Sequence, residues 1–316
     1  MIIVNLRVNF DLLYLYNLNM LTQKYFNMKT CQILHKQLKN LYFHKYNYSK
    51  AKDVNIEDNE RMTHFGFKEV KESEKAKQVH TVFENIANNY DKMNDIMSLG
   101  IHRIWKDIFI QELAPTHGTR LLDCAAGTGD ISFRYINFLK NTKNINSVES
   151  YVTVCDINEY MLDVGKIRAE RLGYTVENNC NIEWKKEDAE NLNFPDESFT
   201  AYTIAFGIRN VTHIDKVLSE AYRVLKPGGR FLCLEFTHLE NDFLQWLYEQ
   251  YSFQVIPVMG TLVTGKWEPY QYLAESIKKF PKQEDFKHMI DMSGFRNTSY
   301  KNLSCGIVAI HSGFKI

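Results

Sequence analysis

From about Thr63 to the end of the chain, short apolar runs alternate with segments whose apolar residues recur at helical spacing. The apolar runs predict five strands, at Thr119–Ala125, Tyr151–Cys155, Ile182–Lys186, Phe199–Phe206 and Arg230–Phe236. The segments between them predict three helices, at Ile131–Leu139, Asn158–Leu172 and Ile214–Leu225. Strands that alternate with helices are typical of an α/β fold with a mostly parallel sheet.

Capping and turn residues support these boundaries, since Asn158 is a good N-cap and Pro227 would stop the third helix. The last part of the chain predicts one more helix and two short strands, at Glu284–Met292, Thr298–Asn302 and Ile307–Ile310. Residues 141–150 are polar and indicate a surface insertion. The long aromatic stretch from Thr237 to Phe280 fits no simple strand–helix–strand unit.

The first 50 residues differ in composition from the rest, with seven basic side chains against a single acid, Asp11. A basic, acid-poor, partly amphipathic start is typical of an organelle transit segment, although this one has lysine in place of arginine and few serines. An unstructured extension is the alternative interpretation. Polar residues break the apolar run from Val8 to Leu21, so it is a poor membrane span. We therefore expect an N-terminal extension at 1–60 and one catalytic domain at 61–316.

Charge and cysteine content exclude some classes of protein. Lys and Arg together number 38 among 316 residues, as do Asp and Glu, and a net charge of zero argues against a nucleic-acid partner. The six cysteines form neither a CxxC pair nor a cluster with histidines, so we expect no metal site and no disulfide framework. Three of them, Cys124, Cys155 and Cys233, lie in apolar runs and are expected to be buried thiols in a reducing compartment.

A glycine loop follows the first predicted strand, in the sequence DCAAGTGD from Asp123 to Asp130. Its glycines, Gly127 and Gly129, allow a sharp turn close to a ligand. A dinucleotide is disfavoured, because Ser132 stands where a third glycine would be needed and the charge of Asp130 would repel a pyrophosphate. Asp123 instead suits the ammonium group of a methionyl moiety. The loop therefore predicts S-adenosylmethionine (SAM) as the ligand.

Two further acids follow the next two strands. Asp156 could accept hydrogen bonds from both ribose hydroxyls, and Asp188 with the amide of Ala189 could hold the edge of adenine. Each acid alone is more simply a solvated loop residue. Three acids at successive strand ends, together with the glycine loop, favour a SAM site.

Several blocks then show a family resemblance. The segment YDKMNDIMSLGIHRIW, from Tyr90 to Trp105, and RVLKPGGRFLCLE, from Arg223 to Glu235, resemble the two signatures of the ubiquinone/menaquinone biosynthesis C-methyltransferases. The likeness covers roughly Thr63 to Ile316 and implies a Rossmann-like class I SAM-dependent methyltransferase, with a seven-stranded mostly parallel sheet and helices on both faces. The expected donor-binding residues are Asp123, Ala125, Gly127, Thr128, Gly129, Asp156, Asp188, Ala189 and Ala205. Ala205 stands where the family is expected to have a serine, so that hydroxyl contact is absent.

The resemblance implies methyl transfer to a ring carbon of a polyprenyl benzoquinol. Such a carbon becomes nucleophilic when a phenolic proton is lost. Arg209 stays protonated, so we expect it to hold the phenolate or to polarise a water that Asn210 orients. Tyr90 is expected to act with them, and His102 and Trp105 to cover the site. The aromatic stretch after Phe243 is expected to form the acceptor wall.

The extension favours the ubiquinone precursor 2-polyprenyl-6-methoxy-1,4-benzoquinol and a peripheral location on the matrix side of the mitochondrial inner membrane, with other ubiquinone-biosynthesis enzymes as partners. Alternatives are demethylmenaquinol methylation and a non-catalytic assembly partner with this fold. A nucleic-acid methyltransferase is disfavoured because no PPY-type block follows the fourth strand. A small-molecule O-methyltransferase would lack the block from Tyr90 to Trp105.

Overall fold

A computed structural model describes residues 61–84, 94–95, 97–142, 148–175 and 181–316. Its main sheet has seven strands, which confirms the predicted fold class. In chain order they are β3 (Arg120–Cys124), β4 (Tyr151–Asp156), β5 (Asn181–Lys186), β6 (Phe199–Ala205), β7 (Leu225–Phe236), β8 (Arg296–Leu303) and β9 (Val308–Phe314). The extension at 1–60, Tyr90, Cys31, Cys180 and residues 143–147 of the predicted insertion lie outside the described residues.

The order of the strands in this sheet is β5-β4-β3-β6-β7-β9-β8. The first five are parallel, whereas β9 pairs antiparallel with both β7 and β8. The chain runs outward from β3 in one direction through β4 and β5, and in the other through β6 and β7. Ligands bind at the carboxyl ends of the strands at such a switch point, so the loop after β3 is the expected place for a site.

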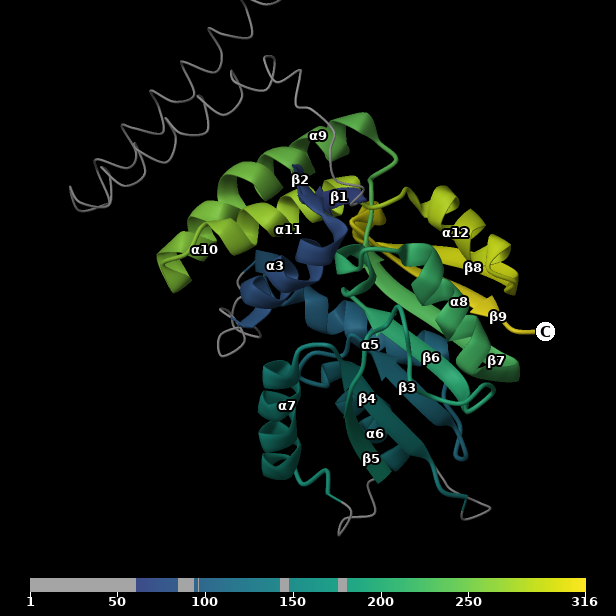
Figure 1. Ribbon diagram of the computed structural model, residues 1–316. Helices are drawn as coiled ribbons and strands as arrows, with labels where there is room; N and C mark the ends of the chain where they lie inside the picture. Colours follow the sequence, from purple (N-terminus) through teal and green to yellow (C-terminus); the bar gives the residue numbers. More distant parts are fainter. Residues whose placement is uncertain (1–60, 85–93, 96, 143–147, 176–180) are drawn as a thin grey trace, which may run out of the picture. The chain divides into compact units, whose positions relative to one another are not determined.

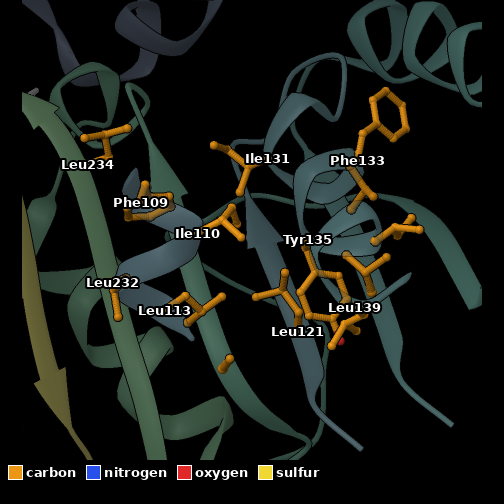
Figure 2. Close-up of a cluster of buried hydrophobic side chains, with 14 of the residues drawn as sticks. Phe109, Ile110, Leu113, Leu121, Ile131, Phe133, Tyr135, Leu139, Leu232 and Leu234 are labelled. Carbon is orange, nitrogen blue, oxygen red and sulfur yellow. The ribbon is translucent and has the colours of Figure 1, made fainter. Parts of the chain in front are cut away.

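Alternate residues of the central strands point to opposite faces of the sheet, and both faces are buried. Leu121 and Leu232 belong to the cluster under helices α5 (Ile101–Leu113), α6 (Asp130–Lys140) and α7 (Glu159–Arg171). Their neighbours Leu122 and Cys233 belong to the cluster under α8 (Ile214–Val224) and α12 (Gln283–Met292). Figure 2 shows side chains of α5 and α6 meeting those of β3 and β7 in the first cluster. Burial on both faces explains why these strands are continuous apolar runs.

The predicted boundaries hold to within a few residues, with one clear difference. Asn158 caps α7 as expected, because its side chain accepts a hydrogen bond from the Met161 N–H at 3.3 Å. The strand predicted to begin at Arg230 instead begins at Leu225, directly after α8. The Pro-Gly-Gly segment at 227–229 is therefore part of β7. Leu225 pairs with Phe199 and Arg230 with Ala201, so a register shift accommodates the extra residues.

The aromatic stretch after β7 folds into helices rather than another strand–helix unit. They are α9 (Asp242–Gln250), a π-helical segment at Tyr251–Val255, α10 (Ile256–Thr264) and α11 (Glu268–Lys279). Asn241 caps α9 through its side-chain oxygen. Pro257 stands in the first turn of α10, where its missing N–H is tolerated. Figure 1 shows these helices gathered beside α3 (Glu72–Glu84), away from β5.

The described part of the chain begins with a hairpin, β1 (Met62–Phe65) and β2 (Lys68–Lys71), which leads into α3. No helix among the described residues is long and apolar enough to cross a membrane. No cluster of three or more His, Cys, Asp or Glu side chains with metal-binding geometry occurs in the same residues. Cys124, Cys155 and Cys233 are buried free thiols, as predicted.

Candidate active site

A cavity of about 390 Å³ lies at the carboxyl ends of β3, β4, β5 and β6. Eight of the nine predicted donor-binding residues line it, namely Asp123, Ala125, Gly127, Thr128, Asp156, Asp188, Ala189 and Ala205. The ninth, Gly129, is the residue before α6 and has a φ of 79°, which favours glycine. A β-carbon there would lie 2.8 Å from the Trp184 ring, so a glycine is required for space as well.

The loop after β3 is held by the acid at the end of β4. One carboxylate oxygen of Asp156 accepts the Gly127 N–H at 2.8 Å, and the other accepts the Asn158 N–H at 2.8 Å. Burial raises the pKa of Asp156, and these two bonds offset part of that effect. Each carboxylate oxygen has a second acceptor site, so Asp156 can support the loop and still bind a hydroxyl in the cavity.

Asp123 is fully buried beneath the same loop. It accepts hydrogen bonds from the hydroxyls of Ser132, at 2.6 Å, and Thr203, at 3.0 Å. Burial raises the pKa of Asp123 to about 6 despite these two donors. A buried carboxylate with only neutral partners is stabilised by a cation in the cavity beside it.

Asp130 has different surroundings. Its carboxylate lies 2.8 Å from the Lys106 ammonium, 3.4 Å from the Arg168 guanidinium and 3.6 Å from that of Arg134. Although burial alone would raise it, these three cations hold the pKa of Asp130 well below its usual range. Asp130 is therefore an ionised carboxylate that cations on three sides compensate, which the sequence argument about repulsion of a pyrophosphate did not consider.

A second cavity, of about 260 Å³, adjoins the first and shares two lining residues with it, Lys106 and Phe206. Its wall is largely apolar and aromatic and comes from α5, the end of β7 and the helices α9 to α11. Among the lining residues are His102, Trp105, Phe236, Tyr248, Tyr251, Tyr270 and Tyr272. An apolar space beside a polar one can hold a hydrophobic acceptor next to a polar donor.

Arg209 and Asn210 lie in a short 3₁₀ turn after β6 and line different cavities, Arg209 the second and Asn210 the first. Arg209 Nη1 donates to Glu235 at 2.8 Å and to the carbonyl of Phe206 at 2.6 Å. The side chains of this ion pair are 5% and 0% exposed. Burial raises the pKa of Glu235, and Arg209 offsets part of that effect. The hydroxyl of Tyr272 donates to Asn210 Oδ1 at 3.1 Å.

His102 has a fixed partner, because its Nε2 lies 2.9 Å from Asp95 Oδ1. Burial lowers the pKa of His102, which favours the neutral ring, and Asp95 offsets part of that effect. Sequence reasoning missed Lys106, Phe206 and Glu235 as site residues. Lys106 directly follows the resembling block and Glu235 ends the second one, so their positions were available, but the burial of their charges was not.

The comparisons with known proteins agree on one family. The family model "ubiE/COQ5 methyltransferase family" matches residues 68–315. A mitochondrial 2-methoxy-6-polyprenyl-1,4-benzoquinol methylase of Drosophila melanogaster is 64% identical over 263 residues, which are 83% of this chain and 87% of the relative. Proteins with the same description from Mus musculus and Homo sapiens are 53% and 51% identical, each over 280 residues that cover 80% of this chain and 84% of the relative.

Solved structures are more distant. A SAM-dependent methyltransferase of Thermotoga maritima superposes with a TM-score of 0.50 at 20% sequence identity, over 75% of this chain and all of that one. At this level of identity the likeness concerns the fold. It agrees with the fold built on the seven-stranded sheet.

Proposed function

We propose that this chain, which belongs to the ubiE/COQ5 methyltransferase family and is therefore a SAM-dependent methyltransferase, methylates a ring carbon of 2-methoxy-6-polyprenyl-1,4-benzoquinol in ubiquinone biosynthesis. The observation that carries the proposal is the pair of adjoining cavities, one with several acids among its lining residues and one with a largely apolar and aromatic lining. The first suits the donor, and the second suits a prenylated ring. The relatives with this activity in their descriptions match over most of their length.

In the proposed donor site the three acids have separate roles. Asp123 faces the methionyl ammonium, Asp156 the ribose hydroxyls, and Asp188 with the Ala189 amide the adenine. The loop residues Ala125, Gly127, Thr128 and Gly129 let the backbone approach the donor, and Ala205 lines the cavity without a hydroxyl. The three acids lie at the carboxyl ends of three adjacent parallel strands, since Asp123 is in the last two residues of β3, Asp156 ends β4 and Asp188 follows β5.

We propose that Arg209 stabilises the phenolate of the acceptor. Its guanidinium stays protonated, lines the apolar cavity and is anchored by Glu235. Asn210 would orient a water that takes the phenolic proton, and Tyr90 would complete the site. A sulfonium and a phenolate give neutral products, so an apolar surrounding favours transfer over the separated charges.

A prenylated acceptor implies work at a membrane surface. The α9–α10 surface, made of the exposed side chains of Phe243, Leu244, Trp246, Leu247, Val255 and Leu262, is suited to peripheral contact with lipid. Its helices also line the apolar cavity through Tyr248, Tyr251 and Ile256, and no charged residue occurs from Gln250 to Gly265. Together with the relatives described as mitochondrial, this supports contact with a mitochondrial membrane, for which we propose the matrix side of the inner membrane and partners in the same pathway.

The activity is tested with purified full-length chain, labelled SAM and a short-chain prenyl analogue of the methoxybenzoquinol. We expect the product to carry one new methyl group on the ring carbon. In a separate experiment, the chain should restore respiratory growth to a mutant blocked at ring C-methylation. Demethylmenaquinol is the competing acceptor in the same assay. Preference for it would change the assigned substrate, and no transfer to either quinol would favour a non-catalytic role.

The extension is tested separately with a fusion of residues 1–60 to a fluorescent reporter. We expect import into mitochondria, because the segment is basic and poor in acids. A second fusion in which Lys24, Lys29, Lys36 and Lys39 are changed to glutamine should remain in the cytosol. If both fusions are cytosolic, residues 1–60 are not a transit segment, and the enzymatic proposal is unaffected.

A further inference from the structure

Tyr272 of α11 and Asn210 of the turn after β6 join the walls of the two cavities. The Tyr272 hydroxyl donates to Asn210 Oδ1 at 3.1 Å. Tyr272 lines the second, acceptor cavity, whereas Asn210 lines the first, donor cavity. Methyl transfer requires the ring carbon of the acceptor to lie next to the methyl group of the donor. We therefore expect the ring of the acceptor, rather than its prenyl tail, to lie beside Tyr272.

The side chain of Tyr272 is held in place and keeps its proton. The residue is only 5% exposed, and its ring stacks on that of Phe65 with the centroids 4.3 Å apart. Burial raises the pKa of Tyr272, so the hydroxyl remains protonated. A tyrosine hydroxyl has one proton to donate, and its oxygen can also accept a hydrogen bond. While the proton is given to Asn210, the Tyr272 oxygen can only accept a hydrogen bond from a ligand.

The two redox states of a benzoquinol acceptor differ in what they offer to such an oxygen. The quinol has two hydroxyl groups, and each can donate a hydrogen bond. The corresponding quinone has two carbonyl oxygens, which only accept. Tyr272 could donate to a carbonyl only by releasing Asn210 Oδ1, so a quinone would leave one buried acceptor without a donor. A site that binds a ligand hydroxyl in this way rejects an analogue without the hydroxyl.

We infer that the Tyr272 oxygen accepts a hydrogen bond from a hydroxyl of the quinol and thereby selects the reduced acceptor over the quinone. Asn210 is a positioning residue for this selection, because it turns the Tyr272 proton away from the ligand. The two amide N–H groups of Asn210 stay available for the proposed water. Only the reduced form has a phenolic proton whose loss makes a ring carbon nucleophilic. The inference deepens the proposed function and rests on its acceptor half.

The test compares a short-chain prenyl methoxybenzoquinol with the quinone that has the same tail. Both are titrated by calorimetry into full-length protein in oxygen-free buffer, with S-adenosylhomocysteine bound so that no methyl transfer occurs. Wild-type protein should bind the quinol about tenfold or more tightly than the quinone. Tyr272→Phe should weaken quinol binding by about tenfold, while the affinity for the quinone should not fall. The preference for the quinol should then be about twofold or less.

A second variant acts on the same preference from the side of the quinone. Asn210→Ala removes the acceptor of the Tyr272 proton, so the hydroxyl can turn and donate to a carbonyl. The affinity for the quinone should therefore rise relative to that for the quinol by about fivefold or more. Tyr174→Phe is the matched control, because the Tyr174 hydroxyl also donates to an asparagine, Asn137 Oδ1, at 2.8 Å, and neither residue lines a cavity. This variant should keep the wild-type preference.

Three outcomes would overturn the inference while the proposed acceptor stands. Equal losses of quinol and quinone affinity in Tyr272→Phe would mean that the hydroxyl only anchors the turn after β6. A wild-type preference in Tyr272→Phe would mean that another group reads the redox state. Equal binding of quinol and quinone by wild-type protein would mean that no residue does so. If wild-type protein binds neither compound, the acceptor half of the proposed function fails and the inference falls with it.

Discussion

At the scale of single residues, the ionisation of Asp123 is coupled to the binding of the methyl donor. Its pKa in the folded protein is about 6, against an ordinary value of 3.8, because the carboxylate is buried. The neutral carboxyl therefore contributes stability that is complete below about pH 4 and is lost as the pH rises through about 6. Above that pH the unliganded fold holds an ionised group with only hydroxyl partners, which a donor ammonium would stabilise.

Donor affinity should consequently depend on pH in this window. Binding needs the ionised form of Asp123, so below pH 6 the protein must release a proton when SAM binds, and affinity should fall by about tenfold per pH unit. Calorimetry at pH 5.5 in buffers of different ionisation enthalpy measures this proton. Asp123→Asn should bind more weakly and release no such proton. Equal proton release from that variant would assign the titration to another group.

Arg209 gives a prediction about turnover. Arg209→Lys keeps a positive charge but loses the planar guanidinium that donates to Glu235 and to the Phe206 carbonyl. We expect kcat to fall by about a hundredfold or more while SAM affinity, measured by calorimetry, stays within about twofold. Arg296→Lys, at the start of β8, is the control. Unchanged kcat in Arg209→Lys would place the phenolate elsewhere.

The sequence predicted the acids of the site better than its cations. Asp123, Asp156 and Asp188 could be found because each ends or follows an apolar run, and parallel strands bring such residues to one edge. Lys106 and Glu235 could not be found as charged partners, because a charge is buried by residues far away in the chain. Asp130 shows the same limit, since two of the three cations that compensate its charge, Lys106 and Arg168, lie far away in the chain.

At the scale of elements, α7 is fitted closely to the donor loop. Gly165 lies in the middle of this helix, where glycine is normally unfavourable. A β-carbon at this position would lie 2.6 Å from the Trp184 ring and 3.0 Å from the carbonyl oxygen of Thr128. Trp184 also packs against Phe133 of α6. The helix can approach the loop only because this position has no side chain.

Gly165→Ala should therefore lower the stability of the protein, although helix propensity alone predicts the opposite. Alanine usually stabilises a helix interior by about 1 kcal/mol over glycine, but overpacking here should cost about 1–3 kcal/mol. Thermal or urea unfolding measures the change, and SAM affinity should fall because Thr128 lines the donor cavity. Asp163→Ala, at an exposed position of the same helix, is the control. A more stable Gly165→Ala variant would show that Trp184 moves aside freely.

The helices of residues 237–280 were missed for a physical reason. In α9 and α10 some apolar residues, such as Tyr248 and Ile256, line the second cavity while others, such as Phe243 and Leu262, remain exposed, so their apolar positions do not form one stripe. The local signals were nevertheless present, since Asn241 precedes α9 and Pro257 opens α10. Strands β3, β4 and β6 were easier, because burial on both faces leaves apolar runs.

At the scale of the whole described domain, the α9–α10 surface adjoins the apolar cavity. Phe243→Glu together with Trp246→Glu should shift the protein from membranes to the soluble fraction, because two rings that are 64% and 53% exposed would no longer enter lipid. Vesicle co-sedimentation measures this change. SAM affinity and turnover of a short-chain quinol should be preserved.

Ile167→Glu, which alters an exposed apolar residue of α7, is the matched control and should bind vesicles as wild-type protein does. Equal binding by the double variant would mean that another surface contacts the membrane. Loss of short-chain turnover in the double variant would show instead that α9 is needed to shape the acceptor cavity.

The two cavities have separate surroundings, and this separation has a kinetic consequence. Among the described lining residues, those of α9 to α11 border only the acceptor cavity and those of the loops after β3, β4 and β5 only the donor cavity. Helix α3 and the turn after β6 contribute to both, and the residues that line both are Lys106 and Phe206. If the acceptor cavity faces lipid as proposed, S-adenosylhomocysteine can leave the donor cavity for the aqueous phase, and SAM can replace it, while the acceptor cavity stays in contact with the membrane. At saturating SAM the initial velocity should therefore depend on the mole fraction of quinol in the bilayer. Adding quinol-free vesicles that fuse with the substrate vesicles lowers this mole fraction while the bulk concentration of quinol stays constant. We expect the velocity to fall in this surface-dilution experiment.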